Sequence, residues 1–314
     1  MEMLDIKKQM MGRRKFLKNT LIIPFFGSLA SVLNTSSVYS ANSINRVAAH
    51  KIKISLNAFS FNKQLSDGTI NLFDLLDFCA EIGFDALDTT AYYFPNYPNT
   101  PNDNYIYALK RKAFLLGLEI SGTGVRNDFS NPDKDKRRAD INLIKDWIIC
   151  ASKLGAPVIR IFSGKEIPKG YNWEQIFDWM IDDIKECVEF GRNHGVLVAV
   201  QNHNEYLKTS DDIHKLISLV NSDWFGLTLD IGSLRMGDPY EEIQKVAKYA
   251  LSWQIKEHVY YNNEKVETDY GRIINIAKQA GYRGYLPLET LVRENTEDRV
   301  KQLFKNFSLA LNAN

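Results

Sequence analysis

Four apolar runs in the second half of the chain end in polar side chains that can take part in chemistry. The residues that close these runs are Gln201, Asp230, Gln254 and Glu289. Burying a carboxylate directly after an apolar run costs free energy unless the group is paired or bound to a metal. Asp230 and Glu289 are therefore the strongest candidates for a functional site.

Groups that can carry a proton lie near two of these positions. His203 follows Gln201 by two residues, and Lys256 follows Gln254 by two, so each shares a strand face with its amide neighbour. Next to carboxylates, an imidazole or a lysine of lowered pKa acts as an acid or a base. The alternatives are structural, namely a hydrogen-bonded histidine and a lysine salt bridge. We expect the strand that carries Gln254 to continue to His258.

The elements that must position these residues repeat one sequence pattern from residue 51 onward. Short apolar runs alternate with longer amphipathic runs, which is typical of βα units and a mainly parallel sheet. Strand-like runs begin near Ile52, Phe84, Leu118, Pro157, Val196, Trp224, Leu251 and Gly284. Helical patterns cover residues 72–82, 105–116, 139–154, 173–194, 211–220, 240–250, 270–280 and 296–311. This pattern predicts an α/β fold, a single (β/α)8 TIM barrel over residues 51–314, with its site at the C-terminal ends of the strands.

A doubly wound open sheet is the rival architecture, because it also alternates strands and helices. Such a sheet normally carries a glycine-rich phosphate turn after an early strand. The candidate Gly122-Thr123-Gly124 lacks the third glycine, and no helix start follows it. The sequence therefore favours the barrel.

In its strand endings the chain resembles the sugar phosphate isomerase/epimerase family, whose members have xylose isomerase-like barrels. The phrases that carry the resemblance are Leu229-Asp230-Ile231-Gly232, Gln254-Ile255-Lys256-Glu257 and Leu288-Glu289. That family closes the same four strands with a Glu, Asp, His and Glu metal set. The resemblance places Gln201, Asp230, Gln254 and Glu289 at these positions, so two residues match the family and two depart from it.

The resemblance implies a divalent metal and proton transfer at a carbon beside a carbonyl group. Four oxygen ligands with two negative charges suit Mn²⁺ or Mg²⁺ better than zinc. Gln201 cannot carry a proton, which disfavours epimerisation by two glutamates. A one-base reaction led by Glu289, with His203 or Lys256 as its partner, remains open.

Further residues are candidates for substrate binding at the barrel mouth. Arg160 closes the fourth predicted strand and either holds sugar hydroxyls or balances charge within the barrel. Tyr92 and Tyr93 lie in an aromatic loop that either stacks on sugar rings or packs locally. Glu205 and Glu257 either reach the site or lie on a solvated rim.

The N-terminal segment has the features of a targeting signal. Residues 12–18, Gly-Arg-Arg-Lys-Phe-Leu-Lys, resemble a twin-arginine export motif, and a moderately apolar stretch over residues 21–33 follows. We therefore assign residues 1–45 to an export signal and linker and expect a periplasmic or otherwise exported protein. The apolar stretch is too short and too polar for stable membrane insertion.

Composition and charge limit the kinds of binding partner that the sequence predicts. The net charge is +1, and the clustered positive charges lie in the N-terminal segment, so nothing indicates a nucleic-acid surface. Three cysteines without a CxxC spacing predict buried, inert thiols rather than disulfides or a zinc site. A homo-oligomer remains open.

Three functions follow from these expectations. The first is a metal-assisted isomerase- or epimerase-like enzyme that acts on a non-phosphorylated sugar or an oxidised glycoside, because phosphorylated sugars are retained in the cytoplasm. The alternatives are a lyase that cleaves 3-keto-glycosides by β-elimination and a sugar-binding barrel without catalysis.

Overall fold

The computed structural model describes residues 52–203 and 206–313 of the chain. Its strands are β1 (Ile52–Asn57), β2 (Ala86–Asp88), β3 (Glu119–Gly124), β4 (Val158–Phe162), β5 (Leu197–Gln201), β6 (Phe225–Asp230), β7 (Ala250–Gln254), β8 (His258–Tyr261), β9 (Glu264–Glu267) and β10 (Gly284–Leu288). Its α-helices are α2 (Asn62–Ser66), α3 (Leu72–Ile82), α4 (Asp103–Leu115), α5 (Lys134–Leu154), α6 (Trp173–Asn193), α7 (Ser210–Val220), α8 (Pro239–Val246), α9 (Tyr270–Gln279) and α10 (Thr296–Ala313).

Eight of the described strands form one parallel sheet that curls into a barrel. The strand order is β10-β1-β2-β3-β4-β5-β6-β7, so from β1 to β7 the strands lie in chain order, and the last strand, β10, pairs with the first. The ends of the sheet meet just beyond β7, where Ile255 N–H donates to the carbonyl of Pro287 (2.8 Å) and Glu289 N–H donates to the carbonyl of Ile255 (2.9 Å). This closure confirms the predicted (β/α)8 barrel.

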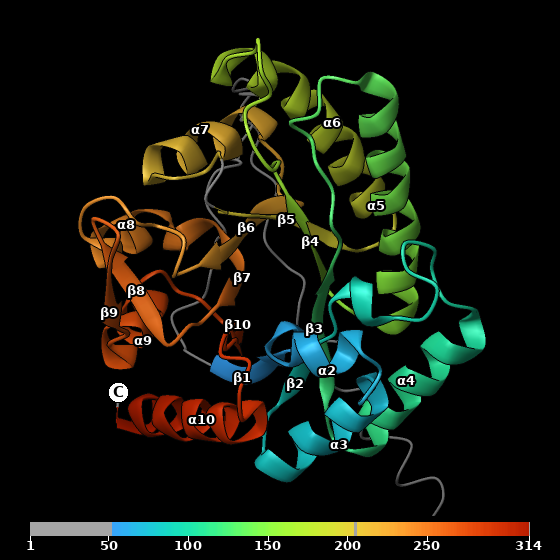
Figure 1. Cartoon of the computed structure of the whole chain (residues 1–314), viewed down its shortest axis with the longest axis vertical. Coiled ribbons are helices and arrows are strands. Elements are labelled where there is room, and N and C mark those ends of the chain that lie inside the picture. Colours follow the sequence, from blue (N-terminus) through green and yellow to red (C-terminus); the bar gives the residue numbers. More distant parts are fainter. Residues whose placement is uncertain (1–51, 204–205, 314) are drawn as a thin grey trace, which may run out of the picture. The chain divides into compact units, whose positions relative to one another are not determined.

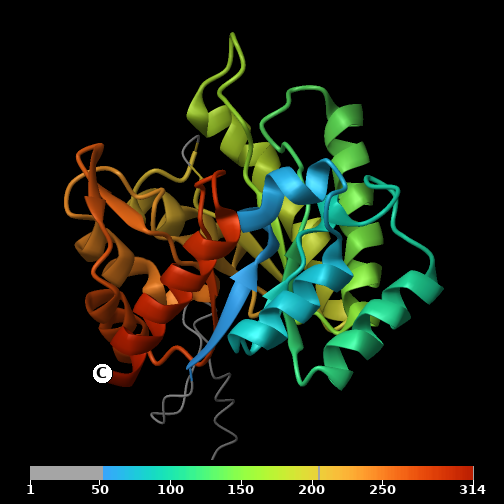
Figure 2. The ribbon, with the colours of Figure 1, turned by 60° about the horizontal axis from the view of Figure 1, so that its bottom comes forward.

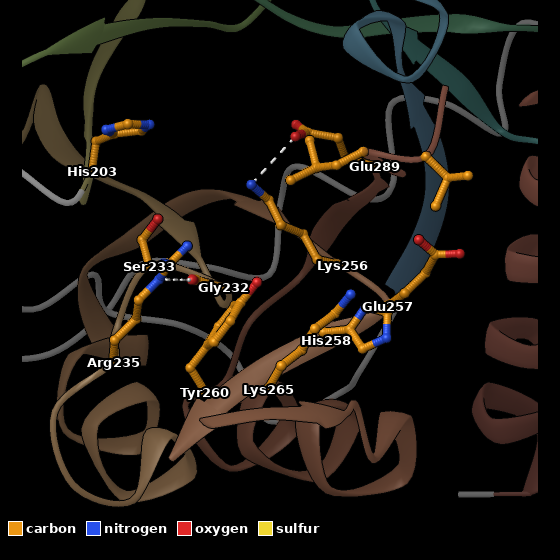
Figure 3. Close-up of a pocket in the computed structure, with 12 residues that line it drawn as sticks. His203, Gly232, Ser233, Arg235, Lys256, Glu257, His258, Tyr260, Lys265 and Glu289 are labelled. Carbon is orange, nitrogen blue, oxygen red and sulfur yellow. Dashed lines mark hydrogen bonds and ion pairs between the residues drawn. The ribbon is translucent and has the colours of Figure 1, made fainter. Parts of the chain in front are cut away.

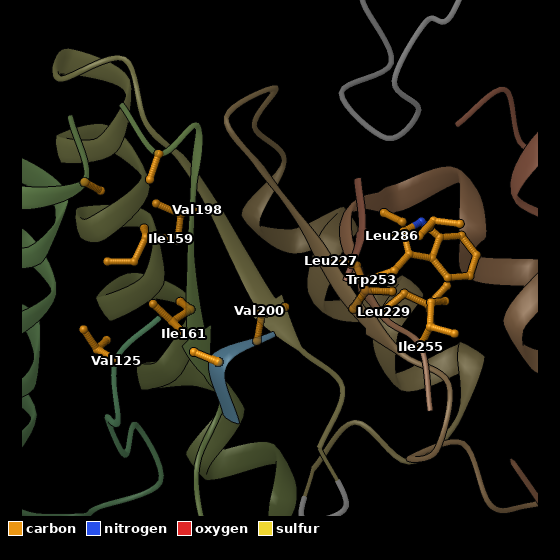
Figure 4. Packing of buried hydrophobic residues seen from close by; sticks show 14 of the residues in the cluster. Val125, Ile159, Ile161, Val198, Val200, Leu227, Leu229, Trp253, Ile255 and Leu286 are labelled. Carbon is orange, nitrogen blue, oxygen red and sulfur yellow. The ribbon is translucent and has the colours of Figure 1, made fainter. Parts of the chain in front are cut away.

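The helices form an outer layer around the strands (Figures 1 and 2). Large apolar side chains alternate with smaller or polar ones in strands such as β6 and β7, which separates the two faces of the sheet. Most of the apolar face is buried, and Figure 4 shows Leu227, Leu229, Trp253 and Leu286 packed together. This packing holds the strand ends that carry the site in fixed positions.

Local sequence signals mark the starts of several helices, although α5 begins at Lys134, five residues before its predicted start. Asn71 caps α3 in a capping box with Asp74, and Asp238 caps α8 with a proline at its first turn. Thr209 caps α7, and its side chain accepts the N–H of Asp212 in another capping box. The three cysteines are buried free thiols, as predicted.

One expectation about the seventh strand is wrong. β7 ends at Gln254, and His258 instead begins β8, which pairs antiparallel with β9 in a separate hairpin. At the tip of this hairpin Asn262 and Asn263 have positive φ angles of 47° and 69°, the conformation of the tightest hairpin turns. The chain therefore leaves the barrel after Lys256 and adds a wall to its mouth.

The predicted export signal over residues 1–45 lies outside the described residues, so the twin-arginine assignment stays a prediction. Among residues 52–203 and 206–313, no helix has the length and apolar character needed to cross a membrane.

Candidate functional site

A lysine ammonium group sits between two carboxylates at the C-terminal end of the barrel. Lys256 Nζ lies 2.9 Å from Asp230 Oδ2 and 3.3 Å from Glu289 Oε1. Both acids are almost completely buried, and the lysine side chain is 15% exposed. β6 supplies the aspartate, while the residues just beyond β7 and β10 supply the lysine and the glutamate. The structure thus brings together the two acids that the sequence singled out.

Two glutamines complete the inner ring of polar groups. Gln201 Nε2 donates to Asp230 Oδ2 (2.9 Å) and to Gln254 Oε1 (2.7 Å). Both neighbours are acceptors, so the Gln201 amide must present its nitrogen to them. The four strand-end residues therefore converge: hydrogen bonds join Gln201, Asp230 and Gln254, and Lys256 links Glu289 to Asp230.

The backbone around Asp230 holds its carboxylate in place. Asp230 Oδ1 accepts the N–H of Gly232 at 2.9 Å. The amide of Asn202 bonds both backbone groups of Asp230, with its nitrogen 2.9 Å from the carbonyl and its oxygen 2.8 Å from the N–H. Sequence reasoning did not single out Asn202, although it directly follows Gln201.

The pKa values of the two carboxylates are shifted in opposite directions. Burial raises the pKa of Asp230, but Lys256 together with the hydrogen bonds from Gly232 and Gln201 brings it below its usual value. Burial raises the pKa of Glu289, and the attraction of Lys256 only partly offsets this effect. Asp230 is thus the permanent anion, and Glu289 is the group whose proton affinity is tuned upward.

The sequence leaves two possibilities open for Lys256, an acid or base of lowered pKa and a structural salt bridge. Burial lowers the pKa of its ammonium, but the negative charges of Asp230 and Glu289 outweigh burial and raise it. These ion pairs correspond to the second alternative drawn from the sequence, a lysine salt bridge. The raised pKa favours the protonated ammonium, and a catalytic role for Lys256 stays a prediction.

The donor set does not fit a divalent metal as it is arranged. Lys256 Nζ stands between the two carboxylates, where an ion would have to bind, and Gln201 presents an N–H rather than an oxygen. Among the described residues, no group of three or more His, Cys, Asp or Glu side chains is placed to hold a metal. The Mn²⁺ or Mg²⁺ expected from the sequence is unconfirmed, and the residues present suit an ammonium ion.

Two cavities open onto this centre, and His203, Lys256 and Glu289 line both of them. The first cavity, of about 300 Å³, is completed mainly by Gly232, Ser233, Arg235, Glu257, His258, Tyr260 and Lys265. Figure 3 shows these side chains around the Lys256–Glu289 ion pair. The second cavity, of about 270 Å³, is completed mainly by Asn57, Phe59, Tyr92, Arg160, Phe162, Gln201 and Gln254. A small substrate in either cavity would reach Glu289.

Arg160 and Tyr92 form a preorganised pair in the second cavity. Arg160 Nη2 donates to the Tyr92 hydroxyl (2.7 Å), and its Nη1 donates to the carbonyl of Val125 (2.6 Å). A side chain at Gly124 would place its Cβ 2.8 Å from the guanidinium carbon, so glycine makes room for the arginine. Gly124 thus serves the packing of Arg160, whereas a Cβ at Gly122 would instead meet Val158 and Asp88.

The other residues predicted for the site from the sequence do not all lie in the two cavities. The His203 ring lies edge-on to Phe162, with ring centroids 5.5 Å apart, and Glu257 accepts a hydrogen bond from Thr290 (2.9 Å) in the first cavity. Tyr93 donates to Asn62 (2.8 Å) and lines neither of the two cavities, which favours local packing. Glu205 lies outside the described residues. Functional roles for all of these residues stay predictions.

Two polar residues near the site were missed by sequence reasoning. Asn57 closes β1 and lines the second cavity. Asp88 closes β2, and burial raises its pKa from 3.8 to about 6, while Arg160 and the N–H of Thr90 act in the opposite direction. The rule that identified Asp230, a carboxylate closing an apolar strand, also fits Asp88 after Ala86 and Leu87.

Comparison with known proteins adds independent findings on the fold. A D-psicose 3-epimerase from Clostridium cellulolyticum H10 superposes with a TM-score of 0.69 at 16% identity, over 82% of this chain and 99% of its own. A 3-keto-D-glucoside 4-epimerase from E. coli gives a TM-score of 0.66 at 12% identity, over 83% of this chain and 100% of its own. The IolI protein, with a bound zinc atom, gives 0.67 at 16% identity, over 83% and 98%. At such identities these likenesses bear on the fold alone.

A search of curated protein sequences finds no match. The family model described as xylose isomerase-like TIM barrel matches residues 76–308, which is most of the chain. This match agrees with the closed barrel and with the strand endings that suggested the resemblance. The chain therefore belongs to the xylose isomerase-like TIM barrel family.

Proposed function

We propose that the protein is a carbohydrate enzyme that moves a proton at the carbon next to a carbonyl group, as sugar isomerases and epimerases do. The observation that carries the proposal is the buried Glu289 carboxylate, which lines two cavities beside the Asp230–Lys256 ion pair. The family and its epimerase neighbours support the same class of reaction.

In this reaction Glu289 acts as the base. Its carboxylate takes the proton from the carbon beside the carbonyl, the electron pair of the C–H bond forms a C=C bond, and the carbonyl π electrons move to the oxygen. The hydroxyl group on the deprotonated carbon gives its proton to that oxygen and becomes the new carbonyl group, while Glu289 returns its proton to the former carbonyl carbon, which completes an isomerisation. Burial raises the pKa of Glu289, which suits a group that both accepts and returns a proton.

The number of groups that can carry a proton limits which reaction the site can catalyse. Inversion at a carbon needs proton carriers on both of its faces, and Gln201 stands where the family has a second glutamate. Lys256 is held by two carboxylates, so His203 is the other proton carrier that lines both cavities. Isomerisation by Glu289 alone, or epimerisation by Glu289 with His203, is consistent with this set.

Gln201 also favours a second candidate, a 3-keto-glycoside lyase. One base suffices for β-elimination: Glu289 removes the proton at C2, the C1–O bond breaks, and the alcohol leaves with a proton returned by Glu289. The predicted export signal favours non-phosphorylated substrates in both cases. Neither proposal includes a bound metal, because Lys256 already pairs with both carboxylates.

The test is a substrate panel in D₂O. The purified protein is incubated with non-phosphorylated aldoses, ketoses and 3-keto-glycosides, and NMR and mass spectrometry follow deuterium uptake and products. We expect Glu289→Gln to lose at least about 10²-fold in rate, the usual contribution of a general base. Its melting temperature should change little, since burial already disfavours the charged form. Glu264→Gln, at an exposed position in β9, is the matched control and should keep the wild-type rate.

The outcomes separate the candidates. An isomerised or epimerised sugar supports the first candidate, and an unsaturated ketone with release of the alcohol supports the lyase. Full activity in Glu289→Gln would remove Glu289 as the base. Absence of turnover and of deuterium uptake across the panel would refute the proposed function.

A further inference from the structure

The contacts of Lys256 resemble those of a bound cation more than those of a surface lysine. Its ammonium group is 2.9 Å from Asp230 and 3.3 Å from Glu289, at a buried position where four strand ends converge. These two acids are the residues that match the family's metal set. A positive charge thus lies on the chain itself at the point where the family binds a metal.

The two departures from the family agree with this arrangement. A divalent ion is best balanced by two or three carboxylates, whereas one ammonium needs fewer negative charges. Gln201 and Gln254 are neutral, and Gln201 donates an N–H to Asp230 rather than offering an oxygen to the centre. Gln201 therefore removes one of the family's three negative charges, which matches the smaller charge of a lysine, whereas Gln254 replaces a neutral histidine and leaves the charge unchanged.

The backbone also makes space for the lysine stem. A Cβ at Gly232 would lie 3.0 Å from Cδ of Lys256, closer than nearly all carbon contacts in proteins. The same glycine donates its N–H to Asp230 Oδ1 (2.9 Å). A glycine here lets the lysine side chain pass while the aspartate stays oriented.

We infer that Lys256 replaces the divalent cation of the family as a fixed positive charge and donates a hydrogen bond to a substrate oxygen. An ammonium group has three N–H donors, and the two carboxylates account for two of them. The nitrogen also borders both cavities, where a carbonyl oxygen of the substrate would bind. This second role rests on the proposed function, in which negative charge develops on that oxygen and Lys256 keeps its proton throughout.

The test measures metal binding directly, without turnover. Wild-type protein, Lys256→Gln and Lys265→Gln are stripped with chelator and titrated with Mn²⁺, and binding is followed by electron paramagnetic resonance and thermal unfolding. Lys265→Gln is the control, because it removes an exposed lysine of the first cavity and leaves the buried pair intact. We expect wild type and Lys265→Gln to bind no Mn²⁺ at about 1 mM.

Lys256→Gln should gain a Mn²⁺ site, because the carboxylates of Asp230 and Glu289 lose the cation that balances them and can bind an ion in its place. We expect at least a tenfold rise in Mn²⁺ affinity. At a hundred times the dissociation constant, ligand linkage corresponds to a melting temperature about 5 °C higher. If this variant does not fold, Gln201→Glu/Lys256→Gln, which adds a third carboxylate, replaces it in the same titration.

Two results would overturn the inference. One is a wild-type protein that binds one equivalent of Mn²⁺ or loses stability on chelation; the other is a folded variant without Lys256 that gains no Mn²⁺ affinity. The activity panel then distinguishes the two proposals. Metal-free wild-type protein without turnover would refute the proposed function alone, whereas turnover that requires Mn²⁺ would refute the role of Lys256 alone.

Discussion

Ionisation of Asp88 should weaken the fold as the pH rises from 5 to 7. Burial raises the pKa of this residue from 3.8 to about 6, so the folded protein holds its proton more tightly than the unfolded chain does. The stabilisation is fully present below pH 3.8 and is lost as the pH rises through 6. Asp88→Asn, which is neutral at every pH, lacks this dependence.

The magnitude follows from the two pKa values. The complete change corresponds to about 3 kcal/mol, since each pKa unit is worth about 1.4 kcal/mol. Between pH 5 and pH 7 only part of it is expressed, and proton linkage gives about 1 kcal/mol. Paired denaturation curves resolve a difference of this size. The comparison does not depend on the total stability of the protein.

The assay is urea unfolding of wild type and Asp88→Asn at pH 5 and pH 7, followed by tryptophan fluorescence. We expect the free energy of unfolding of the wild type to fall by about 1 kcal/mol more than that of the variant over this interval. Asp182→Asn, at an exposed position in α6, is the control and should follow the wild type. Identical pH dependence in wild type and Asp88→Asn would refute the claim that burial at the end of β2 holds this proton.

Two further perturbations test separate parts of the protein. Gly124→Ala places a Cβ 2.8 Å from the guanidinium of Arg160. We expect a loss of about 1–3 kcal/mol in the free energy of unfolding, as for other overpacked sites. Unchanged urea unfolding curves would show that Arg160 does not need this space. Replacement of Arg13 and Arg14 by lysine should trap the precursor in the cytoplasm when the fractions of an expressing cell are immunoblotted, and normal export would rule out the twin-arginine route.

Much of the barrel could be predicted because its signals are local. Alternating apolar runs, capping residues such as Asn71 and glycines just beyond helices act within a few residues of chain. The expected start of every barrel strand lies within two residues of the observed one. The hairpin of β8 and β9 was missed because only three residues separate β8 from β7, so the two strands were taken as one. The turn signal at Asn262-Asn263 indicates the hairpin.

Sequence by itself determined which side chains close the strands, and hence that Asp230 and Glu289 meet at one end of the barrel. Only the tertiary structure decided what lies between them. Lys256 is 26 residues from one acid and 33 from the other, and it reaches both because the chain bridges from Ile255 to β10 before it leaves the barrel. The competition between burial and charge that sets the pKa of Lys256 depends on distances of about 3 Å across this closure. Spacing along a chain does not carry such distances, because they arise only when the sheet closes on itself.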